Sequence, residues 1–147
     1  MAYGQSKYPD WLGEPVLLEP ANPAAGAIYT LTVPAQYVYL IESIRFTLAT
    51  AVAVANRQPE IKFYNPTPTL FLNSRSSLLQ TASLTWNWNC WSAGPAIAPV
   101  QAQLEIHMVF CNHILPPGWQ MAIDCLSIAA ADQFSNIKIY VRRWRLS

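Results

Sequence analysis

Proline is the residue type that most constrains how this chain can fold. Among its 147 residues the sequence has 12 prolines and only 5 glycines. Proline lacks a backbone N–H group and fixes φ, so it interrupts helices and is excluded from central strands. From residue 28 onward the prolines separate short segments in which apolar and polar side chains alternate. This combination favours strands joined by stiff connections over a helical bundle.

The alternation is clearest in residues 103–111, where Leu104, Ile106 and Met108 are separated by single residues such as Glu105. Side chains on a strand point alternately to its two faces, so such a segment buries one face. No segment shows a convincing helical period. We therefore expect an all-β protein, a single jelly-roll-like β-sandwich of seven or eight strands. The expected strands cover residues 29–33, 37–50, 60–64, 77–89, 103–111, 119–126 and 136–144, where residues 77–89 form either one long strand or a hairpin.

The first 26 residues differ from the rest of the chain. Their prolines argue against a helix or a central strand, whereas their apolar side chains are too many for a solvated linker. An extended segment of this kind lies along a surface, and we expect that surface to belong to a neighbouring subunit. The sequence thus predicts an extended arm over residues 1–26 and a sandwich domain over residues 27–147. The arm residues expected to contact the partner are Tyr3, Tyr8, Trp11, Val16, Leu17 and Leu18.

Composition excludes several classes of protein. Hydrophobic residues make up 52% of the chain and charged residues 12%, about half the usual share of charge, which excludes intrinsic disorder. The net charge of +1 gives no signal for nucleic acid. No apolar stretch approaches the roughly 18 residues of a membrane-spanning helix. The apolar excess instead predicts that other chains cover part of the surface.

Cysteine content and the N-terminus indicate the compartment. The chain has 3 cysteines, and this odd number argues against a disulfide framework. The N-terminus lacks the basic region and apolar block of a secretory signal. We therefore expect synthesis in a reducing cytoplasm.

Candidates for nucleophilic catalysis or metal binding are weak. Cys111 and His113 form a close cysteine–histidine pair, but a nucleophile also needs a third group that orients its base. A buried thiol beside a loop histidine explains the pair equally well. The cysteines and histidines lack paired zinc-ligand spacing, and no loop gathers the oxygen ligands of calcium. We expect no catalytic residues, no cofactor and no metal.

Paired carboxylates are the signature of a glycoside hydrolase, an enzyme class found on sandwich folds. Basic neighbours accompany the strand acids here, since Arg45 follows Glu42 and Lys62 follows Glu60. Solvation on a polar face or pairing with a base is the favoured role of these acids. The strand acids are Glu42, Glu60, Glu105 and Asp124.

Tryptophan is concentrated in residues 86–91. On a strand, Trp86 and Trp88 share one face while Asn87 and Asn89 share the other. Flat aromatic rings flanked by amides form platforms for sugar rings, so a glycan-binding site is one interpretation. We favour a core or subunit-interface stripe, because indole rings bury a large area and this chain has an apolar excess. The residues concerned are Trp86, Trp88 and Trp91.

The chain ends in a basic cluster. Arg142, Arg143 and Arg145 flank an aromatic residue, Trp144. A basic patch with an aromatic ring can bind nucleic acid. In a near-neutral chain, however, an edge-strand guard or contact with an anionic partner explains the cluster as well. We expect no specific nucleic-acid ligand and assign the three arginines to contact with an anionic partner.

Several sequence blocks follow one another in a defined order along the chain. The blocks are Val33-Pro34-Ala35, Ser43-Ile44-Arg45-Phe46-Thr47-Leu48, Ala53-Val54-Ala55-Asn56-Arg57-Gln58, Leu115-Pro116-Pro117-Gly118-Trp119, Ala130-Ala131-Asp132-Gln133-Phe134-Ser135 and a final strand that closes on Trp144. In their order and spacing they resemble a segment of the small β-sandwich structural virion proteins of tailed bacteriophages, the capsid cement or decoration type. The similarity extends over about residues 28–145.

This resemblance implies a non-enzymatic part of the virion. The expected protein is made in the bacterial cytoplasm and located at the capsid surface. As a homotrimer it would stabilise the head through contacts with itself and with the major capsid protein. A connector or tail position stays open, and so does a carbohydrate-binding module for host attachment that uses Trp86, Trp88 or Trp91.

Overall fold

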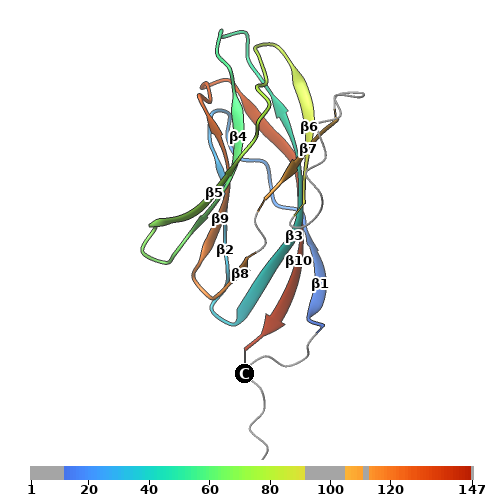
Figure 1. The fold of residues 1–147 in the computed structure, drawn as a ribbon, viewed down its shortest axis with the longest axis vertical. Helices are drawn as coiled ribbons and strands as arrows, with labels where there is room; N and C mark the ends of the chain where they lie inside the picture. The colour runs from blue at the N-terminus through green and yellow to red at the C-terminus, as the bar shows by residue number, and fades with distance from the viewer. Residues whose placement is uncertain (1–11, 92–104, 111–112, 147) are drawn as a thin grey trace, which may run out of the picture.

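The computed structural model describes residues 12–91, 105–110 and 113–146. Ten strands form two sheets that pack face to face, and these described residues contain no helix (Figure 1). The expected all-β sandwich is therefore confirmed. The described part of the chain accordingly has no helix long and apolar enough to cross a membrane.

Each sheet has a simple order. We call them sheet A, on the right in Figure 1, and sheet B, on the left. Strand pairs are antiparallel except for the parallel pair formed by the sixth and seventh strands. Sheet A runs β1 (Glu14–Leu18), β10 (Gln133–Arg145), β3 (Tyr37–Ala49), β6 (Thr85–Trp91) and β7 (Glu105–Val109), with β8 (Ile114–Leu115) also paired to β3; sheet B runs β2 (Tyr29–Thr32), β9 (Gln120–Leu126), β4 (Gln58–Tyr64) and β5 (Leu70–Arg75).

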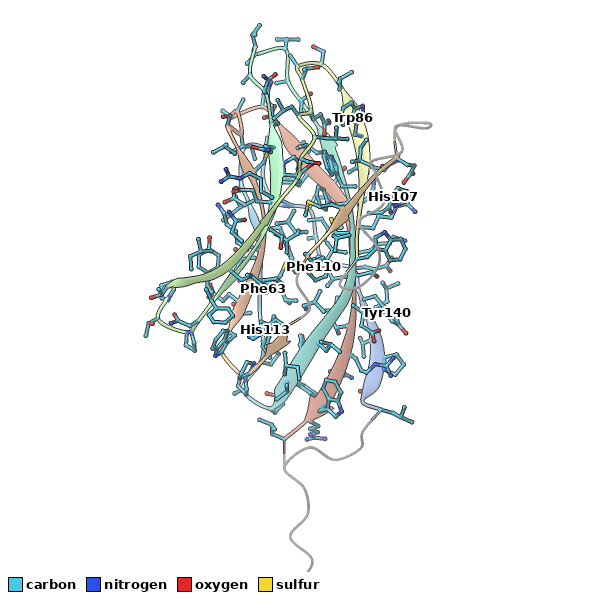
Figure 2. All side chains as sticks on the ribbon, viewed as in Figure 1. Phe63, Trp86, His107, Phe110, His113 and Tyr140 are labelled. Carbon is cyan, nitrogen blue, oxygen red and sulfur yellow. The ribbon has the colours of Figure 1, made fainter. Side chains whose placement is uncertain are left out.

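The core lies between the two sheets. Phe46 of β3 stacks on Trp88 of β6 with ring centroids 6.3 Å apart, and it meets Phe134 of β10 edge to face at 5.4 Å. Figure 2 shows Phe63 and Phe110 directed into the same layer. The residues predicted to face inward are buried, which confirms the two-residue period for β3 and β10: Ile44, Phe46, Leu48, Ile137, Ile139 and Val141.

Part of the predicted arm belongs to sheet A. The sequence places the start of the sandwich at residue 27, whereas Glu14–Leu18 forms the edge strand β1 and pairs with β10. Pro15 is compatible with this position because an edge strand tolerates a missing N–H group. Val16 and Leu18 pack against the core, and Leu17 points outward. The arm residues Tyr3, Tyr8 and Trp11 lie outside the described residues.

Two further differences concern the middle of the chain. The predicted strand over residues 77–89 begins only at Thr85. The turn before β6 contains Ser83, whose φ is 57°. Next to Ser83, the Leu84 N–H donates a hydrogen bond to the Thr50 hydroxyl, and this hydroxyl donates to the Leu84 carbonyl. Strand β5 was not predicted, because Leu70-Phe71-Leu72 is a continuous apolar run without alternation.

Candidate functional site

A row of side chains crosses the outer face of sheet A in register. Leu17 of β1 lies opposite Tyr140 of β10, which lies opposite Ser43 of β3. Ser43 in turn lies opposite Trp91 of β6, and Trp91 lies opposite Val109 of β7. Directly opposed residues project from the same face of a sheet. Five strands therefore contribute one residue each to a continuous line, which we call the apolar row.

The apolar row is open to solvent in the single chain. The exposed fractions are 51% for Leu17, 38% for Tyr140, 44% for Trp91 and 41% for Val109. Figure 2 shows Tyr140 projecting from the outer side of sheet A. Isolated exposed apolar side chains are normal on a protein surface, whereas a contiguous group marks an interaction site. The register brings these four residues onto one line across the sheet, with Ser43 between Tyr140 and Trp91.

A hollow of about 230 Å³ opens where the row crosses β3. Its cause is local, since Ser43 is small and stands between the two large rings of Tyr140 and Trp91. Neighbouring strands are about 4.8 Å apart, which puts the two aromatic residues roughly 10 Å from each other across the hollow. The lining residues are Leu17, Ser43, Ile44, Arg45, Asn89, Cys90, Trp91, Lys138 and Tyr140.

The polar side of the hollow carries charges that are already paired. Lys138, Arg45 and Asn89 form the next row along the sheet. Lys138 Nζ lies 3.0 Å from Glu19 Oε1, and Arg45 Nη2 lies 3.0 Å from Glu105 Oε1. Glu105 also accepts a hydrogen bond from the amide of Asn89. The hollow therefore combines apolar walls with a neutralised polar border.

Trp91 is held in place by a neighbouring histidine. Its indole stacks on the His107 imidazole with ring centroids 6.4 Å apart and planes 14° from parallel. The indole N–H donates to Nδ1 of His107 across 3.4 Å. The two rings therefore meet at the N–H edge of the indole, and this contact restrains the orientation of Trp91 beside the hollow.

Trp86 and Trp88 have a different role. They are only 6% and 0% exposed, and the Trp88 indole N–H donates to Gln80 Oε1 over 2.9 Å. A buried indole cannot stack on a ligand, so these two residues form no glycan platform; they belong to the core, which is one of the two roles that the sequence favours. The alternation along β6 explains the outcome, because it turns Trp86 and Trp88 inward and Trp91 outward.

The basic cluster is used largely within the chain. Arg142 Nε donates to Glu42 Oε1 over 2.9 Å, and Arg143 Nε donates to Glu14 Oε2 over 2.7 Å. The Arg143 guanidinium also lies 4.8 Å from the centre of the Tyr37 ring. The Arg143–Glu14 pair secures β1 against β10, whereas the contacts of Arg142 with Glu42 and of Arg143 with Tyr37 join β10 to β3. Contact of these two arginines with an anionic partner stays a prediction. Arg145 is exposed at the end of β10.

The predicted basic partner is confirmed for Glu60 and wrong for Glu42. Glu60 Oε2 lies 2.7 Å from Lys62 Nζ, as expected, and Arg75 and Asp124 complete that cluster. Glu42 pairs with Arg142 in place of Arg45. The register of β3 and β10 decides this partner, because Glu42 lies at the bulge that brings it next to Arg142.

Thiols and metal ligands do not converge in the part of the chain that is described. Cys90 and Cys125 are free and buried, and burial raises the pKa of Cys90 far above its usual range and that of Cys125 to about 12. Cys111 lies outside the described residues, whereas His113 packs against Phe71 and Trp119. Within the described ranges, no three His, Cys, Asp or Glu side chains gather as metal ligands would.

Sequence reasoning identified Leu17 and Trp91 as candidates but missed Ser43, Tyr140 and Val109. Each lies on a predicted strand, and the outward position of Tyr140 follows from the alternation in β10. What the alternation does not contain is the register that aligns five strands.

No protein-family model, curated protein or solved structure matches the chain.

Proposed function

We propose that this chain is a structural subunit of a tailed-bacteriophage virion, a head decoration or cement protein. Its role is to stabilise the capsid through apolar contacts with copies of itself and with the major capsid protein. The observation that carries the proposal is the apolar row, which presents four large apolar side chains on one sheet face. The order of the phage-like sequence blocks supplies the biological setting.

The physical case rests on what the apolar row gains when it is covered. Full burial of one large apolar side chain stabilises by about 1.5–3 kcal/mol. Burial of four such side chains can supply much of the binding free energy of a small interface, and it requires no new ion pair. The bordering charges support this, because Arg45 and Lys138 already have acidic partners. Such a face suits a neutral, apolar partner surface.

A cement protein acts by mass action. A subunit that binds only the assembled shell shifts the equilibrium toward that shell, with no chemical step. We expect a homotrimer at the capsid surface, assembled from chains made in the bacterial cytoplasm. The buried thiols of Cys90 and Cys125 accord with synthesis under reducing conditions.

The solution mass of the chain, alone and mixed with empty heads, tests the proposal. We expect co-sedimentation with heads, and a loss of this binding in Tyr140→Asp, which places a charge in the middle of the apolar row. Leu126→Asp is the matched control, because Leu126 is 45% exposed at the end of β9 in sheet B. Binding to isolated tails or connectors but not to heads would move the subunit to that part of the virion. No binding to any virion part would contradict the proposal.

The hollow supports a second candidate, a carbohydrate-binding module for host attachment. Trp91 and Tyr140 stand on either side of Ser43, with the Asn89 amide beside them. Aromatic rings next to amides suit the apolar face and the hydroxyl groups of a pyranose. Titration with soluble glycans tests this candidate, and saturable binding that Trp91→Ala abolishes would favour it over the structural role.

A further inference from the structure

Two valines are almost fully exposed at one end of the sandwich. Val52 is 82% exposed and Val54 is 99% exposed, the highest values among the large apolar residues in the described part of the chain. They belong to residues 51–55, the sequence Ala-Val-Ala-Val-Ala between β3 and β4. We call this segment the knob loop. In Figure 1 the connection from β3 to β4 lies at the upper end of the molecule.

The knob loop is fixed by buried groups beneath it. Arg57 Nη1 donates to the carbonyl of Ala53 over 2.6 Å and to that of Ala55 over 2.8 Å. Asp132 Oδ1 accepts the N–H of Ala51 over 2.8 Å. The backbone groups of the alanines therefore bond to the buried side chains beneath the loop, whereas the valine side chains between them point to solvent. A loop restrained in this way loses little conformational freedom when it binds.

We propose that the knob loop of one copy docks in the hollow of a second copy, between Trp91 and Tyr140. This inference rests on the proposed structural role and names the partner of the apolar row. It makes the subunit self-complementary, with an apolar projection on the end of one chain and an apolar recess on the face of the next.

Size and charge both match. The hollow measures about 230 Å³, well above the roughly 30 Å³ that one water molecule occupies in the liquid, so it has room for two small branched side chains. The knob loop carries no charged side chain. The hollow offers none without a partner, because Lys138 is paired with Glu19 and Arg45 with Glu105. When the two surfaces meet, no unpaired charge has to be desolvated.

The two surfaces cannot meet within one chain. Strand β3 separates Ser43 in the hollow from Ala49 at the base of the knob loop, a distance of about 20 Å along the strand. The buried ion pair between Arg57 Nε and Asp132 Oδ2, 2.9 Å apart below the loop, holds it at that end. A contact between two different surfaces is heterologous, and it closes into a ring when its rotation allows. A closed ring of three would fit the trimer expected for the subunit.

The first test is the mass of the purified chain by light scattering. Wild type is expected at a multiple of the 16.5 kDa of one chain, and Val54→Asp is expected to shift it to the single-chain mass. Burial of a carboxylate in an apolar recess should weaken association roughly a hundredfold or more. Leu70→Asp is the control, because Leu70 is 48% exposed on β5 of the other sheet. Folding is checked by the urea midpoint at a protein concentration low enough to dissociate the oligomer, and neither change should alter that midpoint because both side chains are exposed in the single chain.

Cysteine pairing identifies the contact itself. In a chain whose Cys111 is replaced by serine, Val54→Cys mixed with Ser43→Cys should form a disulfide-linked dimer under mild oxidation. Val54→Cys mixed with Leu70→Cys should not. A monomeric wild type, or an oligomer that Val54→Asp leaves intact, would overturn the inference while head binding still tests the structural role separately. Saturable glycan binding by a monomer, abolished by Trp91→Ala, would overturn it in favour of a carbohydrate ligand.

Discussion

Arg57 and Asp132 form a two-point ion pair with both side chains fully buried. Arg57 Nε lies 2.9 Å from Asp132 Oδ2, and Arg57 Nη2 lies 3.0 Å from Oδ1, across 75 residues of sequence. Asp132 also accepts the N–H groups of Ala51 and Ala129. The pair joins residues 53–58 to residues 130–135, two segments far apart in the sequence. It ties the base of the knob loop to the start of β10.

Asp132→Asn should be among the most destabilising conservative changes in the chain. The substitution leaves the Arg57 charge buried without a counter-charge, which costs about 3–5 kcal/mol. Urea denaturation measures the change in the free energy of unfolding. Glu19→Gln is the control, since the Glu19–Lys138 pair is exposed on both sides and should contribute less than about 1 kcal/mol.

A double-mutant cycle separates the pair from its surroundings. Arg57→Met combined with Asp132→Asn should cost less than the sum of the two single changes, because neither charge is then left alone. Additive costs would contradict a direct coupling between these two side chains.

Acid should unfold the protein through two buried carboxylates. Burial raises the pKa of Asp132, but hydrogen bonds from Arg57, Ala129 and Ala51 and the Arg57 charge lower it by more, to a net value below the ordinary 3.8. Burial likewise raises the pKa of Glu60, and bonds from Lys62, Asn73 and Arg75 bring it below 4.5. A carboxyl group with a lowered folded pKa stabilises the fold above its unfolded pKa, and this is lost as the pH falls through the folded value.

The free energy of unfolding should therefore stay nearly constant from neutral pH down to about pH 4.5 and decrease steeply below that pH. Urea midpoints measured across this range give the curve. Asp132→Asn removes one titrating group, so its curve should decline less steeply in acid, from a lower starting value. Parallel curves for the two chains would contradict the role assigned to Asp132.

The inward faces of the long strands follow from the sequence because alternation is a local property. Ile44 and Ile139 occupy core positions that a two-residue period predicts from their own neighbours. The edge strand β1 was not predicted because Pro15 argues against a central strand, and the proline rule does not exclude an edge.

The functional face depends on non-local features. Tyr140 and Ser43 meet only through the register of β10 and β3, which no local pattern encodes. Arg57 is absent from the predicted site residues, since a buried charge cannot be recognised before its partner is known. Local patterns thus predict the layers of this fold but not the surface they assemble.

Two tryptophans on one strand should respond in opposite ways to substitution. Trp88→Ala removes a fully buried ring and leaves Gln80 Oε1 without the indole donor, and it should cost about 3–5 kcal/mol of stability. Trp91→Ala removes a half-exposed ring from β6 and should cost less than about 1 kcal/mol. The same change should abolish binding at the hollow. Equal losses of stability would contradict the division of β6 into a core face and a binding face.

Two truncations separate the arm from the edge strand. Removal of residues 1–11 takes away Tyr3, Tyr8 and Trp11 but keeps β1, so we expect weaker occupancy of heads by a folded chain. Removal of residues 1–18 also deletes β1, which strips Val16 and Leu18 from the core and should cost a further few kcal/mol at about 1.5–3 kcal/mol for each buried side chain. It also exposes the edge of β10, and an uncovered edge promotes aggregation.

Urea midpoints and head co-sedimentation measure the two effects. Full head occupancy after the shorter deletion would exclude a partner contact by the first eleven residues, whereas equal stability of both truncations would contradict the structural role of β1.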